Sequence, residues 1–464
     1  MNRNGSRSLG IFPLVMMNFV AIANVRTLPS IAPYGLSMLF FYFVATFCFL
    51  IPTALVSAEL ASGFPGDGGI YHWVSRAMGK KMGFFAVWLQ NANNFICFPM
   101  SLSFVASTLA YGISSQLVDN KAFTIAVILA VVWGGTLLTL NGAKLTGTMS
   151  VIGGFIGTLL PVFIMVAIGI FWLFSGRPSS IEFSMAALVP DLSSPGSISL
   201  FTGVLLGFAG LEMSANHVLD VDNPREKYPR AIFISAAMIL AVSVLGSLAI
   251  AIVVPSGEIA MNTGAMQAMA RFFSEVDLRW MMPLISFAMV IGSITWFCVW
   301  VSGPPRALHV TACNGDLPKW FCALNRHGMP VNIMIAQAAI ASVLSILFIF
   351  AESINAAFWM LTVATAQFLL LMYMLMFLSA IVLKFKCADV ARPYEVPLKK
   401  FGMCTVAGVG FVICALFYAI GFFPPDDICI ERKSTYFLTI AAINVIIGLL
   451  PVFLACRRNG YVRS

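Results

Sequence analysis

The sequence has little charge for its length. Only 10% of its 464 residues are Asp, Glu, Lys or Arg, whereas 60% are hydrophobic and the mean hydropathy is +0.92. Soluble globular domains carry about 25% charged residues, so this composition excludes a soluble domain and indicates an all-α polytopic membrane protein. The net charge of +8 has a topological explanation, and no nucleic-acid partner is expected.

The sequence is also poor in metal ligands and reactive pairs. None of its four histidines has a second ligand at metal-binding spacing. The ten cysteines are scattered without a Cys-x-x-Cys pair, and several lie in apolar segments, where a thiol packs as a small side chain. We therefore expect no metal, no cofactor and no enzymatic activity.

Hydropathy predicts twelve transmembrane helices. They cover roughly residues 9–34, 36–62, 83–113, 122–142, 147–175, 198–219, 231–254, 282–304, 331–350, 355–383, 402–423 and 436–456. If the N-terminus is cytoplasmic, twenty Lys and Arg residues lie in cytoplasmic segments and six in outer segments, with Arg26 left inside a span. This bias predicts that both ends are cytoplasmic.

The span 198–219 combines glycine with a carboxylate near its middle. About ten apolar residues precede Gly207, Gly210 and Glu212, and ten helical residues rise ~15 Å, half the hydrocarbon thickness. Glycine lets the backbone unwind, which is tolerated at that depth only beside a cavity or inside protein. An ionisable group there indicates a functional site, although a glycine packing face with a protonated carboxyl is the alternative.

The first span contains a second candidate break, at residues 23–29. Pro29 suits the first turn of a new half-helix, with Thr27 as its cap. Two breaks five helices apart predict an inverted-repeat transporter whose site lies between them. Half-helix N-termini suit a substrate carboxylate and freed carbonyls suit an ammonium, and an amino acid carries both groups.

Arg26 lies some eight residues, or ~12 Å, inside the outer end of the first span. It has three candidate roles: it pairs with Glu212, it holds a substrate carboxylate, or it extends outward to the interface as a structural residue. Trp296, near the middle of its span, is a candidate wall or gate over the substrate. Tyr373 is the only tyrosine of its span, and its hydroxyl needs a partner.

Four amide side chains occupy one and a half turns of the third span. We interpret Gln90 and Asn91 as interhelical links, which is the usual role of amides in membrane helices. Asn93 and Asn94 are the candidates to face the cavity. Farther along the chain, residues 221–230 are expected to form a charged cytoplasmic docking loop, because prolines bracket their charges.

Several motifs together resemble the amino acid–polyamine–organocation (APC) superfamily, with the glutamate:γ-aminobutyrate antiporters as the nearest branch. Gly-Phe-Ala-Gly-Leu-Glu-Met-Ser-Ala-Asn-His at 207–217 is similar to helix 6 of these transporters, and Asn-Pro-Arg-Glu at 223–226 to the loop that follows. Ala-Glu-Leu-Ala at 58–61, Gly-Pro-Pro-Arg at 303–306 and Gly-Met-Pro-Val at 328–331 resemble the same branch, and the similarity covers nearly the whole chain.

The resemblance implies a LeuT-type 5+5 inverted repeat with discontinuous helices 1 and 6. Residues 1–175 would form the first repeat, 176–383 the second, and 384–464 helices 11 and 12 with a short cytoplasmic tail. It also implies exchange of an amino acid for a related amine or amino acid by alternating access.

Carried over by position, the resemblance also implies site residues. The broken segments would contact the backbone groups of the substrate through Ala23, Asn24, Val25, Phe208, Ala209 and Gly210. Glu212 matches a glutamate linked to proton sensing, and Tyr373 matches a pathway tyrosine. The acid-resistance glutamate antiporter has tyrosine at the position of Arg26 and glutamate at that of Trp296, and Trp296 instead resembles the gating tryptophan of arginine:agmatine exchangers.

The sequence therefore predicts an antiporter of acidic or neutral amino acids in a bacterial inner membrane. A cationic substrate would meet the like charge of Arg26 in a low-dielectric cavity, which disfavours arginine and lysine. A proton-coupled importer is the main alternative, and a transporter-like sensor is a third. The expected partners are small-molecule amino acids and membrane lipid, and a homodimer is the assembly considered.

Overall fold

The computed structural model describes residues 10–66, 68–118, 120–190, 192–193, 198–199, 201–221, 223–346, 354–424 and 433–461. Within these ranges the chain folds into helices and contains no β-strand. The α-helices are α1 (Ile11–Ile22), α2 (Met38–Ala45), α3 (Ile51–Gly63), α4 (Ile70–Met78), α5 (Lys80–Ile113), α6 (Lys121–Thr139), α7 (Ala143–Gly154), α8 (Leu160–Phe174), α10 (Phe201–Phe208), α11 (Pro224–Val253), α12 (Gly264–Glu275), α13 (Met282–Cys313), α14 (Val331–Ile346), α15 (Ile354–Lys386), α16 (Lys399–Ile420) and α17 (Lys433–Tyr461).

Shorter helical segments join or extend these helices. Three longer 3-10 helices are η1 (Val25–Ser30), η2 (Ala32–Ser37) and η7 (Leu211–Asp220). Two π-helical turns, η3 (Thr46–Leu50) and η5 (Phe155–Leu159), lie inside the continuous helical runs α2–α3 and α7–α8. The remaining short turns are η4 (Ser115–Leu117), η6 (Ala186–Leu188), η8 (Ser256–Glu258), η9 (Arg279–Met281) and η10 (Lys319–Cys322).

Ten helices among the described residues are long and apolar enough to cross a membrane, and each overlaps one predicted span. Of the other two predicted spans, 331–350 contains the shorter apolar helix α14. The second, 198–219, contains two short pieces, α10 and η7, instead of one helix. The polytopic all-α class is confirmed, and the number twelve stays a prediction.

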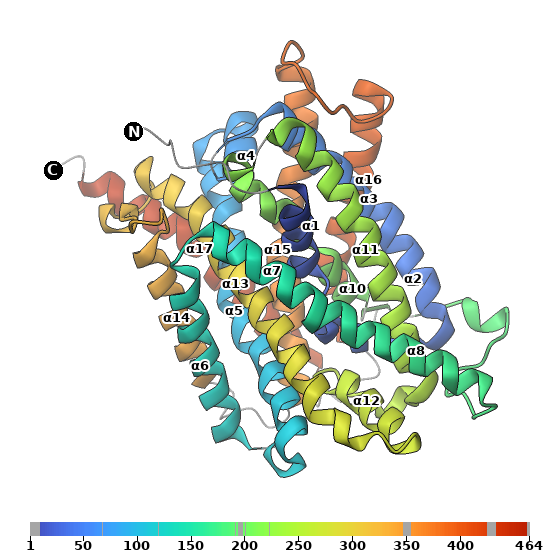
Figure 1. The fold of residues 1–464 in the computed structure, drawn as a ribbon. Helices are drawn as coiled ribbons and strands as arrows, with labels where there is room; N and C mark the ends of the chain where they lie inside the picture. The colour runs from blue at the N-terminus through green and yellow to red at the C-terminus, as the bar shows by residue number, and fades with distance from the viewer. Residues whose placement is uncertain are drawn as a thin grey trace.

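The helices pack around α5, α13 and α15 (Figure 1). In this view α6 and α14 lie at one edge, whereas α2, α3 and α16 lie toward the opposite one. Helix α5 is buried along nearly its whole length, although it contains four amides and Pro99. A helix surrounded by other helices tolerates polar side chains because those neighbours supply hydrogen-bond partners.

A glycine pair sets how closely α13 approaches the α7–α8 run. A Cβ on Gly157 would lie 2.2 Å from the backbone of Gly292, so neither position has room for a side chain. Small residues allow this backbone approach in membrane proteins. The contact positions α13, which carries Trp296 one turn further along, beside the interior of the bundle.

The two ends of the bundle carry different charged segments, as the topology prediction requires. At one end, where α12 lies, Arg177 pairs with Glu275 at 3.0 Å and Arg271 pairs with Glu258. Helix α4 lies at the opposite end (Figure 1), where Lys386 donates to the carbonyl of Arg76 at 3.4 Å. Segments predicted on one side of the membrane therefore meet at one end.

The predicted docking loop at residues 221–230 is wrong. Helix α11 begins at Pro224, so most of this segment forms the first two turns of a helix. Pro224 lies in the first turn, where the missing N–H has no helical partner in any case. The charges of Glu226 and Arg230 are four residues apart and pair at 2.8 Å, which supports the helical turn.

Candidate functional site

The first interruption falls between α1 and η1. Helix α1 ends at Ile22, Ala23 and Asn24 are extended, and η1 begins at Val25. Asn24 caps the new helix, since its side-chain oxygen accepts the backbone N–H of Arg26 at 3.0 Å. The prediction that Thr27 is the cap is wrong: its hydroxyl donates to the carbonyl of Asn24 at 2.9 Å, inside the helix.

The second interruption falls between α10 and η7, at Ala209 and Gly210. Gly210 has φ +125°, a conformation that residues with a Cβ rarely adopt. A Cβ there would also lie 3.1 Å from the Trp300 ring and 3.2 Å from Ile22. Glycine is thus required both by the backbone turn and by the close approach of α1 and α13.

A cavity of about 20 Å³ lies between the two interruptions. Four predicted site residues line it: Arg26, Asn93, Ala209 and Trp296. Its other lining residues were not in the predicted set, and they are Ala21, Ile22, Thr27, Cys97, Leu206, Trp300 and Leu369. This volume holds about one water molecule and is too small for an amino acid.

Arg26 is the charged group of this cavity. Its side chain is buried, at 6% exposure, and its guanidinium carbon lies 5.2 Å from the Trp296 ring centroid. In the described part of the chain it forms no ion pair, and its Nε has no hydrogen-bond partner. The cation–π contact offsets only part of the cost of burying this charge.

This placement decides between the roles considered for Arg26. The predicted pair with Glu212 is not formed, and a buried side chain in a cavity wall is not extended to the interface. Both alternatives are therefore wrong for this conformation. Contact with a substrate carboxylate is the role that remains as a prediction.

Two tryptophans of α13 close the cavity against the end of α1. The indole N–H groups of Trp296 and Trp300 both donate to the carbonyl of Ala21, at 3.2 and 2.8 Å. This carbonyl lies in the last turn of α1, where the helix leaves acceptors without internal partners. Trp300 was missed as a site residue, although its i+4 spacing from Trp296 places both on one helix face.

The amide side chains of α5 that face the cavity and those that link helices are not all the ones predicted. Asn93 lines the cavity, and its Oδ1 is buried without a partner, whereas its amide donates to Asn94. Asn94 was predicted to face the cavity, but it donates to the carbonyl of Trp300 at 2.9 Å and links α5 to α13. Asn91 is such a link, as predicted, since it donates to the carbonyl of Pro304 at 3.2 Å.

Glu212 lies just past the second interruption, in the first turn of η7, and its side chain is 1% exposed. Tyr373 of α15 donates to its carboxylate, and the same hydroxyl accepts the backbone N–H of Gly210 at 2.6 Å. Gln90 of α5 donates to the other carboxylate oxygen at 3.2 Å. Gln90 thus links α5 to η7, as the interpretation as an interhelical link expects, and the group that it contacts is the candidate proton-coupling carboxylate.

The remaining predicted residues lie around these groups without lining the cavity. Ala23 and Asn24 form the first interruption and Val25 begins η1, whereas Phe208 ends α10 and Gly210 belongs to the second interruption. Tyr373 is connected to the break through Gly210. The predicted residues therefore lie close together but in two groups. One group lines the cavity and includes the Arg26 guanidinium, and the other surrounds the Glu212 carboxylate and does not line the cavity.

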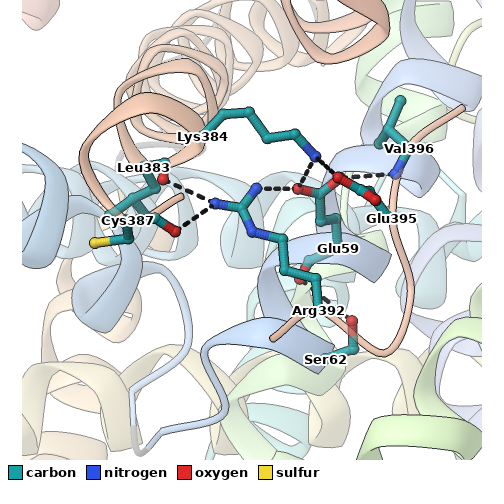
Figure 2. Close-up of polar contacts among 8 residues, drawn as sticks. All are labelled: Glu59, Ser62, Leu383, Lys384, Cys387, Arg392, Glu395 and Val396. Atoms are coloured by element: carbon teal, nitrogen blue, oxygen red, sulfur yellow. Dashed lines mark hydrogen bonds and ion pairs between the residues drawn. The ribbon is translucent and has the colours of Figure 1, made fainter. Parts of the chain in front are cut away.

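A second charged cluster lies at the end of the bundle near α4, and sequence reasoning did not identify it as a site (Figure 2). Glu59 of α3, 0% exposed, accepts from Lys384 of α15 at 2.8 Å, from Arg392, and from the backbone N–H of Val396 at 2.7 Å. Lys384 also donates to Glu395 at 2.9 Å, which holds the pKa of that carboxyl below its usual range.

Comparison with known proteins identifies relatives along nearly the whole chain. A family model described as amino acid permease matches residues 9–448. An uncharacterized transporter of Legionella pneumophila is 40% identical over 92% of both chains. A glutamate/gamma-aminobutyrate antiporter of Lactococcus lactis is 26% identical over 96% of this chain and 90% of its own. A probable agmatine/putrescine antiporter of that species is 24% identical over 68% of this chain and 67% of its own.

Proposed function

Because the chain belongs to the amino acid permease family and is a multi-pass membrane transporter, we propose that it exchanges acidic or neutral amino acids by alternating access. The proposed substrates resemble glutamate and γ-aminobutyrate, in keeping with the Lactococcus lactis antiporter to which the chain is similar. The proposal places the protein in a bacterial inner membrane, with both ends in the cytoplasm, as the distribution of Lys and Arg predicts.

The proposed architecture is a LeuT-type 5+5 inverted repeat of twelve membrane helices. The interruptions after α1 and α10 support it, because they lie in spans separated by four others and face the same small cavity. Residues 1–175 and 176–383 are the proposed repeats, with 384–464 outside them.

The observation that carries the substrate proposal is the guanidinium of Arg26 in the cavity wall, which forms no ion pair with the described residues and whose Nε has no hydrogen-bond partner among them. An anionic group of the substrate would gain a charge-assisted hydrogen bond there, and the protein would no longer bury this cation alone. A cationic side chain would meet like charge, because Arg26 is the only Asp, Glu, Lys or Arg among the described residues that line the cavity. Acidic and neutral amino acids are therefore favoured over arginine and agmatine.

The closed cavity must open before a substrate can enter. The indoles of Trp296 and Trp300 occupy the Ala21 carbonyl, which is the kind of acceptor that a substrate ammonium needs. We assign the two indoles as a gate that releases this carbonyl when the amino acid arrives. Asn93, whose Oδ1 has no partner, supplies a further acceptor in the same cavity.

The experiment is a counter-transport panel with the purified protein in vesicles. Vesicles are loaded with glutamate, glutamine, γ-aminobutyrate, arginine, agmatine or buffer, and uptake of radiolabelled glutamate is followed. Uptake that requires an internal acidic or neutral amino acid supports the proposal. Faster exchange of arginine or agmatine would contradict the substrate class, and uptake into buffer-loaded vesicles driven by a proton gradient would indicate an importer.

A further inference from the structure

The charged cluster around Glu59 opens into a cavity that the proposed transport function does not use. The cavity has a volume of about 480 Å³, within the range of small-molecule sites. It is lined by Lys384, Arg392, Lys399, Lys400 and Glu395, together with Ala388, Val390, Leu398 and Phe401. These residues come from the end of α15, the start of α16 and the connection between them.

The charges of this cavity do not balance. Lys384 and Arg392 are compensated by Glu59 and Glu395, to which they donate (Figure 2). Lys399 and Lys400 form no ion pair within the described ranges, and both residues are exposed. Four cations thus face two carboxylates, which leaves a net formal charge of +2 for an anion to neutralise.

The position of the cavity indicates which anion it meets. One apolar span ends at Lys386 and the next begins at Lys399, so the cavity lies where two spans leave the apolar layer. Three large apolar side chains around it are more than half exposed: Phe385 at 55%, Leu398 at 74% and Phe401 at 71%. Exposed apolar side chains beside clustered cations match a lipid, whose acyl chains contact the former while its phosphate meets the latter.

We propose that this cavity binds the phosphate headgroup of an anionic phospholipid. Lys399 and Lys400 supply the uncompensated charge, while Arg392 and Lys384, fixed by Glu59, form the rigid floor. Lys384 and Arg392 also join α15 and the segment after it to α3 through Glu59. A lipid bound in the cavity therefore adds to the contact between α3 and α15. Basic pockets between membrane helices are known places for such headgroups.

The test uses the full-length purified protein in a neutral detergent, titrated with short-chain phosphatidylglycerol or phosphatidylcholine and followed by native mass spectrometry. We expect preferential binding of phosphatidylglycerol. The variant Lys399→Gln/Lys400→Gln should lose about 30-fold in affinity, since each cation near an anionic headgroup contributes about fivefold. Lys80→Gln/Lys81→Gln is the matched control, because it removes two exposed lysines at the start of α5 that do not line the cavity.

Each result decides the proposal. Equal losses of affinity in the two double variants would overturn it, because the effect would then come from general surface charge. Equal binding of both lipids by the wild type would also overturn it, because the protein would then show no preference for an anionic headgroup. Competition by free glycerol phosphate at the affinity of the lipid would show that the site takes a soluble phosphate and not a lipid. If the double variant does not purify as a folded protein, Lys400→Gln alone should lose about fivefold.

Discussion

At the scale of single residues, the site separates its two charged groups. Arg26 lies in the cavity wall against Trp296, whereas Glu212 lies behind the second interruption with Tyr373 and Gln90. A direct pair would cancel both charges, and neither would then be available to substrate or proton. The proposed function requires this separation, with Arg26 proposed for an anionic group of the substrate and Glu212 for the proton.

The first prediction concerns Arg26. Arg26→Met keeps an unbranched apolar stem and removes the charged guanidinium, so the apparent KM for glutamate should rise at least about tenfold, the value of one charge-assisted hydrogen bond. Radiolabelled uptake in vesicles measures it. Arg177→Met is the control, because Arg177 also lies over an indole, 5.0 Å from Trp172, but outside the cavity. Equal KM values for the two variants would remove Arg26 from substrate binding.

The second prediction concerns Glu212. Glu212→Gln keeps one of the two oxygens that accept from Tyr373 and Gln90 but cannot change its charge, so the pH dependence of transport should flatten while the protein stays folded. Transport rates measured at several external pH values test this. Tyr373→Phe, which removes one donor and keeps the carboxyl, should retain a pH-dependent rate. A wild-type pH profile in Glu212→Gln would exclude Glu212 from proton coupling.

The residue-level errors of the sequence analysis have one physical cause. Asn93 and Asn94 are 100° apart on α5, and only the first faces the cavity. A soluble helix shows its rotation by an apolar stripe, but α5 is buried on every side and has no such stripe. The residue types could thus be predicted from the sequence, whereas the direction of each side chain could not.

At the scale of elements, the interruptions were predictable because backbone chemistry is local. Gly210 and the polar residues around Asn24 disfavour a continuous membrane helix, so they mark the places where the helix is interrupted. The cap was assigned to Thr27 and is Asn24, since several polar residues near a break can serve as caps and the sequence does not rank them. Boundaries therefore differ by a few residues, while the breaks lie in the predicted segments.

The third prediction tests the second interruption. Gly210→Ala places a Cβ at φ +125°, 3.1 Å from the Trp300 ring, and should destabilise the protein by about 1–3 kcal/mol and abolish closure over the substrate. Thermal unfolding in detergent and uptake in vesicles measure the two effects. Gly207→Ala is the control in the same span, because its Cβ meets nothing closer than 3.6 Å and it lies in helix α10. Equal behaviour of both variants would contradict the required turn at Gly210.

At the scale of the whole molecule, the cluster around Glu59 joins segments that the sequence keeps far apart. Glu59 and Lys384 are separated by 325 positions, and Arg392 lies farther still. The sequence shows a carboxylate near the end of one predicted span and cations just after another. The packing of α3 against α15 brings these two helix ends together. Composition and residue spacing do not predict which helix ends meet.

The last prediction compares the contribution to stability of the buried Glu59 with that of Glu226, which forms an exposed ion pair with Arg230. Glu59→Gln leaves the Arg392 guanidinium buried without its carboxylate and should cost about 3 kcal/mol of stability, at the low end for a broken buried pair because Lys384 keeps Glu395. Glu226→Gln removes a carboxylate from an exposed pair with Arg230 and should cost less than about 0.5 kcal/mol. Thermal unfolding of both variants in one detergent gives the comparison. Since Glu59 accepts from α15 and from the connection to α16, a large effect means that it holds these segments on α3, whereas equal midpoints would mean that apolar packing alone does so.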